Sequence, residues 1–458
     1  MSLFWPNFLS RCKFFCGHAM NIKSILLFWC LLGCFFITGC AEAPPVEGDI
    51  EHALAAKNSG SEIDVLKAQG ERIAGTSFVD GNDVDLLRNG ADAYPAMLAA
   101  IRGAKKRIDM ESYTFDGKES EQFGTALLKR RAAGVEINVI YDSWGSAEAP
   151  NTLFDRLRTG GIRVLEYNPI DPASVLDASA DQRDHRKLLL IDGKVAFVGG
   201  INISEVYRLK LKIKNALHVD GDSDDPDPDK LPWRDTQVKI EGPVVGEFER
   251  LFMQTWQEQK GPPLSPPPAT PQTSRGPMEV QVVDSTPDLH RFMIYRSLVV
   301  AISLAQKSVH LTTGFFVPTP DLIDALEDAA RRGVDVSLVL PGLSTSDFAL
   351  KAGRGYYQDL IDAGVKIYER QGAILHAKTT VIDGIYSMVG SFNLDWRSAV
   401  INNECDAVIL GNLFGTQMEN MFVDDIKLSH LIDPQEWSNR SFWERLDEWK
   451  ARLIESLL

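Results

Sequence analysis

Two stretches of this chain, about 200 residues apart, share one order of apolar and polar positions. Residues 100–108 end a helical pattern and lead into the apolar run from Ile108 to Phe115. Residues 301–309 do the same before the run from Val309 to Phe316. Short apolar runs that follow a helical pattern are typical of buried strands. The pattern therefore predicts one structural unit that is used twice.

Within each repeat, the apolar spacing changes between that of a strand and that of a helix. Helical spacing relates Phe123, Leu127 and Leu128 in the first repeat, and Leu322, Leu326 and Ala329 in the second. Gly134 and Gly333 stand where these helices should end, and an Asp-Gly pair at Gly193 and at Gly384 indicates a hairpin turn. The order strand, helix, strand, helix, strand, hairpin predicts an α/β fold of two tandem units, each with a mixed sheet flanked by helices.

Changes in composition give the expected domain boundaries. Residues 40–80 are polar and are expected to form a tether, whereas residues 261–277 are rich in proline, which favours a stiff surface linker. The two units are expected at residues 81–260 and 278–430, with an amphipathic C-terminal helix in residues 431–458.

The C-terminal helix carries Phe442, Leu446 and Trp449 at helical spacing. Its apolar stripe is expected to pack on the body of the protein. Since Trp437 and Trp443 lie nearby, contact with a membrane surface is the alternative.

The N-terminus is typical of a secretion signal. The apolar run from Ile25 to Ile37 is short for a membrane span, and a box that resembles a bacterial lipoprotein cleavage site follows it and ends at Cys40. Residues 1–39 are therefore interpreted as a signal-peptide region in which translation is expected to begin at Met20, after an extension of 19 residues, with Cys40 as the lipidated residue. A competing box ends at Cys34, and an uncleaved anchor is a further alternative. The expected location is a membrane-anchored bacterial lipoprotein, periplasmic or otherwise outside the cytoplasm.

The formal net charge of −15 excludes a general attraction to nucleic acid or to anionic lipid headgroups. An anionic substrate must then be held by a local basic site. The acidic run from Asp220 to Asp229 hints at calcium, but Asp225 and Leu231 occupy the positions where an EF-hand loop needs glycine and glutamate, so a solvated loop is favoured. No zinc-type cysteine spacing occurs, and we expect neither a metal ion nor a cofactor.

The candidate chemistry lies in a His-x-Lys-x4-Asp motif that each unit carries once: His185, Lys187 and Asp192 in the first, and His376, Lys378 and Asp383 in the second. Side chains alternate along a strand, so the histidine and lysine of each motif share a face. Asn202 and Asn393 return on the neighbouring strand of each hairpin. A single such motif would also suit a buried core histidine, but two copies at matching places in a repeat favour a site.

Two such faces together would form a pocket that suits a phosphodiester. The lysines offset the phosphate charge, and the amides together with Ser391 donate hydrogen bonds to its oxygens. One neutral imidazole can attack phosphorus and form a phosphohistidine. The other can donate a proton to the leaving alcohol and later deprotonate the incoming one.

Both motifs resemble those of the phospholipase D superfamily, and the chain from Gly81 to Gly411 resembles bacterial cardiolipin synthases. The resemblance is carried by Leu86–Gly90, Glu111–Phe115, Trp233–Asp235, Ile240–Pro243, Phe315–Pro318 and Gly390–Ser398. It implies a pseudo-two-fold pair of phospholipase D-like units, a covalent mechanism without metal, and the first-repeat histidine, His185, as the nucleophile.

The resemblance also implies a carboxylate that orients each imidazole. Asp235 and Glu404 occupy equivalent places in the two repeats and are the candidates, although Asp235 would also suit a turn that enters a strand. Asp192 and Asp383 precede the hairpin turns and are then expected to be scaffold. Gly200 stands where the second repeat has Ser391, so the pocket is expected to be asymmetric.

The leading functional hypothesis is phosphatidyl transfer between membrane phospholipids, with phosphatidylglycerol and also phosphatidylethanolamine as candidate substrates. A hydrolase that releases phosphatidic acid is the first alternative. A nuclease of the same superfamily and a non-catalytic membrane module are the others, and the acidic charge disfavours nucleic acid as a partner.

Overall fold

The computed structural model describes residues 44–150, 152–169, 181–208, 231–270 and 273–452. These residues belong to one unit, which extends from residue 43 to the C-terminus. The expected signal peptide, Cys40 and the acidic run from Asp220 to Asp229 lie outside the described residues.

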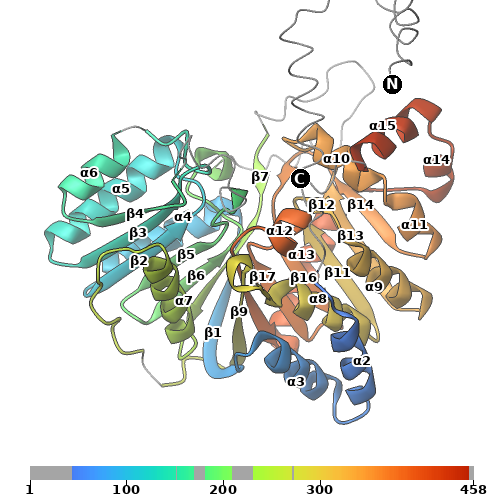
Figure 1. Ribbon diagram of the computed structural model, residues 1–458, viewed down its shortest axis with the longest axis horizontal. Helices are drawn as coiled ribbons and strands as arrows, with labels where there is room; N and C mark the ends of the chain where they lie inside the picture. Colours follow the sequence, from blue (N-terminus) through green and yellow to red (C-terminus); the bar gives the residue numbers. More distant parts are fainter. Residues whose placement is uncertain (1–43, 151, 170–180, 209–230, 271–272, 453–458) are drawn as a thin grey trace, which may run out of the picture. The chain divides into compact units, whose positions relative to one another are not determined.

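The first repeat contributes one half of a mixed sheet (Figure 1). Its main strands are β1 (Val79–Arg88), β2 (Arg107–Ser112), β3 (Glu136–Asp142), β4 (Arg163–Tyr167), β5 (Lys187–Ile191), β6 (Val195–Gly199) and β8 (Thr236–Glu241). In space they follow the order β1-β8-β6-β5-β2-β3-β4. Strands β2, β3 and β4 are parallel, and the remaining neighbours are antiparallel.

The second repeat forms an equivalent half of the sheet, with the strand order β9-β19-β17-β16-β11-β13-β14. These strands are β9 (Met278–Thr286), β11 (Ser308–Thr313), β13 (Asp335–Pro341), β14 (Lys366–Arg370), β16 (Lys378–Ile382), β17 (Tyr386–Gly390) and β19 (Glu404–Leu410), with β20 (Ser429–Leu431) at the edge. β1 pairs with β9 in antiparallel orientation and joins the halves into one 16-stranded sheet. The prediction of two tandem α/β units around a mixed sheet is confirmed.

Helices cover both faces of this sheet (Figure 1). One face carries α7 (Val245–Glu258) and α13 (Asn412–Ile426), whose apolar residues share one core with strands of both halves. The other carries α4 (Asn89–Gly103), α5 (Gly117–Ala132) and α6 (Leu153–Thr159) over the first half, and α8 (Met293–Leu304) and α9 (Pro320–Arg331) over the second. Phe123 and Leu127 of α5 and Leu326 of α9 are fully buried, as their helical spacing predicts.

The two Asp-Gly pairs form tight turns, as expected. Asp192 and Gly193 have φ values of 56° and 68°, and Asp383 and Gly384 have 53° and 68°. Positive φ at both central residues is the conformation that an Asp-Gly pair adopts at low cost, and it matches the twist of the hairpin strands.

The expected tether is wrong for residues 44–80. This segment forms α2 (Glu47–Ala56) and α3 (Glu62–Ala74), and then enters β1. Val65, Leu66 and Ile73 are buried in the core of the second half, which α8 also lines. A few apolar residues on one face are enough to pack an otherwise polar helix against the core. The polar average composition of this segment therefore did not indicate its helices.

The C-terminal segment forms α14 (Pro434–Ser438) and α15 (Phe442–Arg452) rather than one helix. Trp437 is buried, but Phe442 and Trp449 are exposed, so the expected packing of the apolar stripe on the body is wrong within the described residues. None of the helices that the structure describes is long and apolar enough to span a membrane.

The remaining elements are short. They are β7 (Trp233–Arg234), β10 (Arg291–Phe292), β12 (Phe316–Val317), β15 (Ile374–Leu375), β18 (Leu394–Asp395), α10 (Asp347–Arg354), α11 (Tyr357–Asp362), α12 (Trp396–Val400), and the 3-10 turns η3 (Glu205–Arg208) and η6 (Pro287–Leu289).

Candidate active site

The two motifs occupy equivalent places in the two halves. His185 lies two residues before the start of β5 at Lys187, and His376 lies two residues before the start of β16 at Lys378. These lysines pair with the last residues of the central parallel strands, β2 and β11. Each motif therefore lies at the carboxyl edge of its parallel strands, where α/β proteins place their functional groups.

Both histidines and both motif asparagines line one cavity of about 310 Å³ between the halves. Its wall also includes Tyr113, Thr114, Arg183, Trp233, Phe315, Val317, Ser346, Ala349, Asp395, Arg397 and Asn402. The structure thus brings together groups from repeats that are far apart in sequence. The cavity combines imidazoles, amides and arginines with an aromatic rim.

Each imidazole is held by a carboxylate from the other half. His185 Nδ1 lies 3.0 Å from both oxygens of Glu404, and His376 Nδ1 lies 2.7 Å from Asp235 Oδ2. Both carboxylates are fully buried. A backbone hydrogen bond also joins the two halves here: the N–H of His376 donates to the carbonyl of Arg234 at 2.8 Å. Neither half alone pairs its motif histidine with one of its own carboxylates in these contacts.

Burial and neighbouring charges set the protonation states of the site's histidines and carboxylates. It lowers the pKa of His185 to about 4, against the opposing charge of Glu404, and lowers the pKa of His376 well below its usual value. Burial alone would raise the pKa of Glu404, but His185 and Lys187 outweigh it and hold that pKa below the usual range. A neutral His185 that donates Nδ1–H to an ionised Glu404 keeps the lone pair on Nε2, which is the state a nucleophile needs.

The two motif lysines lie beside the histidines but are not among the residues that line the cavity. Lys187 and Lys378 are buried, and each donates through Nζ to the carbonyl of the histidine two residues earlier in its own motif. Burial lowers the pKa of Lys187 to about 7 and that of Lys378 to about 8. A phosphate bound nearby would favour the charged form of both lysines, since an opposite charge raises the pKa of an ammonium group.

The two imidazoles differ in their surroundings. His376 Nδ1 also lies 3.1 Å from the hydroxyl of Tyr207, and burial raises the pKa of its partner Asp235 to about 7. A Cβ atom at Gly200 would lie 2.2 Å from Asp235, so the glycine leaves room for this short carboxylate. The asymmetry expected at Gly200 therefore reflects a different carboxylate on each side.

The structure does not support the expected phosphate-binding role of Ser391. Its side chain is fully buried, donates to Glu404 and accepts the N–H of Cys405 at 3.0 Å. Ser398 donates to the same carboxylate at 2.8 Å. Ser391 is absent from the cavity wall and positions Glu404 instead.

The two asparagines do line the cavity, as expected. Asn202 accepts the N–H of Thr114 at 3.2 Å and donates to Tyr207 at 3.1 Å. The buried side-chain oxygen of Asn393 has no hydrogen-bond partner among the described residues.

The aspartates that complete the two motifs act as scaffold in this structure. Asp192 accepts the N–H groups of Lys105, Lys106 and Arg107 at 2.7–2.9 Å. Asp383 does the same with the three equivalent residues of the second half at 2.6–2.8 Å. Each ties its hairpin turn to the start of the neighbouring parallel strand. Neither lines the cavity.

Tyr207 and Tyr113 are two aromatic residues beside the imidazoles to which the motifs assigned no role. The ring of Tyr113 contacts His185, with centroids 5.1 Å apart, and lies 5.3 Å from Lys187 Nζ. It belongs to a segment that carried the family resemblance, which was its only signal. Tyr207 lies in η3, outside both motifs.

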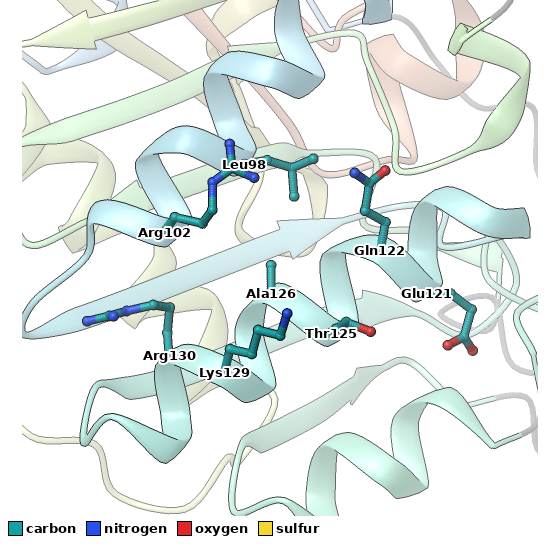
Figure 2. Close-up of a pocket in the computed structure, with 8 residues that line it drawn as sticks. All are labelled: Leu98, Arg102, Glu121, Gln122, Thr125, Ala126, Lys129 and Arg130. Atoms are coloured by element: carbon teal, nitrogen blue, oxygen red, sulfur yellow. The ribbon is translucent and has the colours of Figure 1, made fainter.

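A second, larger cleft of about 610 Å³ lies between α4 and α5 (Figure 2). Arg102 of α4 and Lys129 and Arg130 of α5 line it, but no histidine or cysteine does. It offers neither an imidazole nor a thiol, whereas the smaller cavity holds two imidazoles that are each oriented by a carboxylate, so the smaller cavity is the candidate active site. Among the described residues, no cluster of three or more histidine, cysteine or acidic side chains could hold a metal ion.

Comparisons with known proteins find relatives in the family that the two motifs resemble. A family model described as "Cardiolipin synthase, PLD-like domain" matches residues 97–208 and 298–426. Cardiolipin synthase A of Pectobacterium carotovorum is 33% identical over 386 residues, which cover 82% of this chain and 76% of that one. Its counterpart in Yersinia pseudotuberculosis is 32% identical over 409 residues, or 87% and 80% of the two chains.

The crystal structure of a phosphatidylserine synthase from Haemophilus influenzae aligns with a TM-score of 0.59 at 12% identity. The alignment covers 86% of this chain and 100% of that one. This likeness shows the shared fold.

Proposed function

Since this chain belongs to the cardiolipin synthase family of phospholipase D-like phosphatidyltransferases, we propose that it transfers a phosphatidyl group between two membrane phospholipids through a phosphohistidine. The observation that carries the proposal is the pair of crossed histidine–carboxylate contacts that face one cavity.

His185 is the proposed nucleophile. Its Nε2 attacks the phosphorus of phosphatidylglycerol and forms a P–N bond, while the bond from phosphorus to the glycerol headgroup breaks. As positive charge develops on the imidazole, the ionised Glu404 at 3.0 Å stabilises it. Lys187 and Lys378 offset the charge of the phosphate oxygens.

His376 is the proposed acid and base. When the His376–Asp235 pair carries a proton, His376 donates the proton on its Nε2 to the departing glycerol oxygen. It then removes the proton from the hydroxyl of a second phosphatidylglycerol, whose oxygen attacks phosphorus and releases His185. The products are cardiolipin and glycerol, and both histidines return to their starting states.

Phospholipid substrates imply association with a membrane, and the N-terminal lipoprotein box supplies a proposed anchor at Cys40 outside the cytoplasm. Phosphatidylethanolamine is a further candidate donor, since the bond that breaks is of the same kind. The acidic net charge supports a lipid rather than a nucleic acid as substrate.

Product analysis tests the proposal. The purified full chain, incubated with phosphatidylglycerol, is expected to release glycerol and form cardiolipin, and His185→Gln and His376→Gln are expected to abolish both products. His430→Gln, a substitution of an exposed histidine on β20, is the matched control. Phosphatidic acid without cardiolipin would instead identify a hydrolase.

A further inference from the structure

The helix α15 turns its most apolar side chains away from the protein. Phe442, Trp443 and Trp449 are 69%, 72% and 57% exposed. Together with the half-buried Leu446, they form a stripe at helical spacing. A surface helix of a globular protein usually buries such a stripe, so the orientation of α15 is inverted.

This exposure does not reflect a detached helix, because the opposite face of α15 is anchored. Ala451 is buried in a small cluster with Val317, Ala349 and Ala352. Arg452 lies 4.1 Å above the ring of Tyr356. The contacts fix which side of α15 faces outwards.

The anchoring face adjoins the wall of the catalytic cavity. Val317 and Ala349, which pack with Ala451, also line that cavity, as does Ser346 near the start of α10. The exposed aromatic stripe therefore lies on a helix that is one layer of side chains away from the cavity wall.

The size of the cavity shows what must stay outside it. About 310 Å³ is near the lower end of the roughly 300–1,000 Å³ typical of ligand pockets, which suits a headgroup phosphodiester but not its acyl chains. The chains of both lipids must then remain in the bilayer while their headgroups react. The cavity mouth has to adjoin the lipid surface.

We propose that the stripe of Phe442, Trp443, Leu446 and Trp449 inserts into the interfacial region of the bilayer and holds the cavity mouth against it. This inference rests on the proposed function. Tryptophan and phenylalanine suit this environment, since their rings gain from apolar contact at the headgroup level. The charges of α15 balance, with Glu444, Asp447 and Glu448 against Arg445, Lys450 and Arg452, so the contact is expected to depend little on salt.

The test compares two substrates with the full-length chain. One is a short-chain phosphatidylglycerol kept below its micelle concentration, and the other is phosphatidylglycerol in phosphatidylcholine vesicles. The variant Phe442→Ser/Trp443→Ser/Trp449→Ser is expected to lose about tenfold or more of the vesicle rate, because it removes three large apolar contacts. Its rate on the monomeric lipid should stay unchanged. Leu413→Ser, at an equally exposed position on α13, is the matched control.

A direct readout accompanies the rates. Vesicles that contain brominated phosphatidylcholine should quench tryptophan fluorescence in the parent protein, and quench it less in the triple variant. An unchanged vesicle rate with unchanged quenching would overturn the inference. Equal losses on both substrates would show that α15 supports the cavity instead, and loss of a dimer in sedimentation with an unchanged vesicle rate would assign the stripe to a second copy. If the parent forms no cardiolipin on either substrate, the proposed function fails, whereas the quenching still reports on the stripe.

Discussion

The contact between Glu404 and His185 predicts that Glu404→Gln slows the attack of His185 on phosphorus. Glutamine keeps the shape of the side chain but removes its charge. Glu404 is fully buried, and both of its oxygens lie 3.0 Å from His185 Nδ1. Ser398 also donates to it at 2.8 Å. The substitution therefore acts on a group that stabilises positive charge on His185.

The magnitude follows from this hydrogen bond. A bond to a charged group contributes about 1.5–3 kcal/mol to stability, and we assign a similar contribution to the transition state. At about 1.4 kcal/mol for each factor of ten, the attack of His185 should slow by roughly 10- to 150-fold.

A donor with an activated leaving group isolates that step. Phosphatidyl nitrophenol releases nitrophenolate without a proton, so its burst reports the attack of the nucleophile alone. Glu404→Gln should slow the burst by the factor given above. Asp235→Asn should leave the burst nearly unchanged but slow the reaction of phosphatidylglycerol, because glycerol must be protonated as it leaves. The reverse pattern, in proteins with unchanged circular dichroism, would refute the assigned roles.

Three further predictions concern pH, Ser391 and Asp192. Burial raises the pKa of Asp235 beside His376 to about 7, so the pair loses its proton as the pH rises through that value; kcat/KM for phosphatidylglycerol should fall above about pH 7, and Asp235→Asn should remove this limb of the pH profile. Ser391→Ala should lower kcat by about tenfold and leave KM unchanged in steady-state assays, because the hydroxyl bonds to Glu404 rather than to the cavity; a rise in KM alone would restore its role as a phosphate donor. Asp192→Asn should lower the free energy of unfolding by about 1–3 kcal/mol in urea with kcat unchanged, since it weakens the acceptor of three backbone N–H groups; a loss of kcat at unchanged stability would assign it to catalysis.

The repeated pattern was enough to predict the fold, because strand and helix periodicity, Asp-Gly turns and the order of elements are local properties. It also predicted that each motif lies at a hairpin whose turn is the Asp-Gly pair, as Asp192–Gly193 and Asp383–Gly384 show. The buried positions of α5 and α9 followed from the same periodicity.

The crossing of Glu404 to His185 and of Asp235 to His376 could not be predicted in this way. It depends on the packing of one half against the other through β1 and β9, which is a long-range property. Alignment of the repeats placed the two carboxylates at equivalent positions but did not assign their partners. The hydroxyl of Ser391 was misassigned for the same reason, since only the packed structure shows Glu404 beside it.

The central claim is that His185 carries the phosphatidyl group. The most direct test is mass spectrometry of the denatured His376→Gln protein after reaction with phosphatidyl nitrophenol, because the activated donor still reacts but the base needed for the second step is missing. We predict a phosphatidyl adduct on the peptide that contains His185, and no adduct in the His185→Gln protein. An adduct on His376 in the parent protein, or turnover by the His185→Gln protein, would contradict the account.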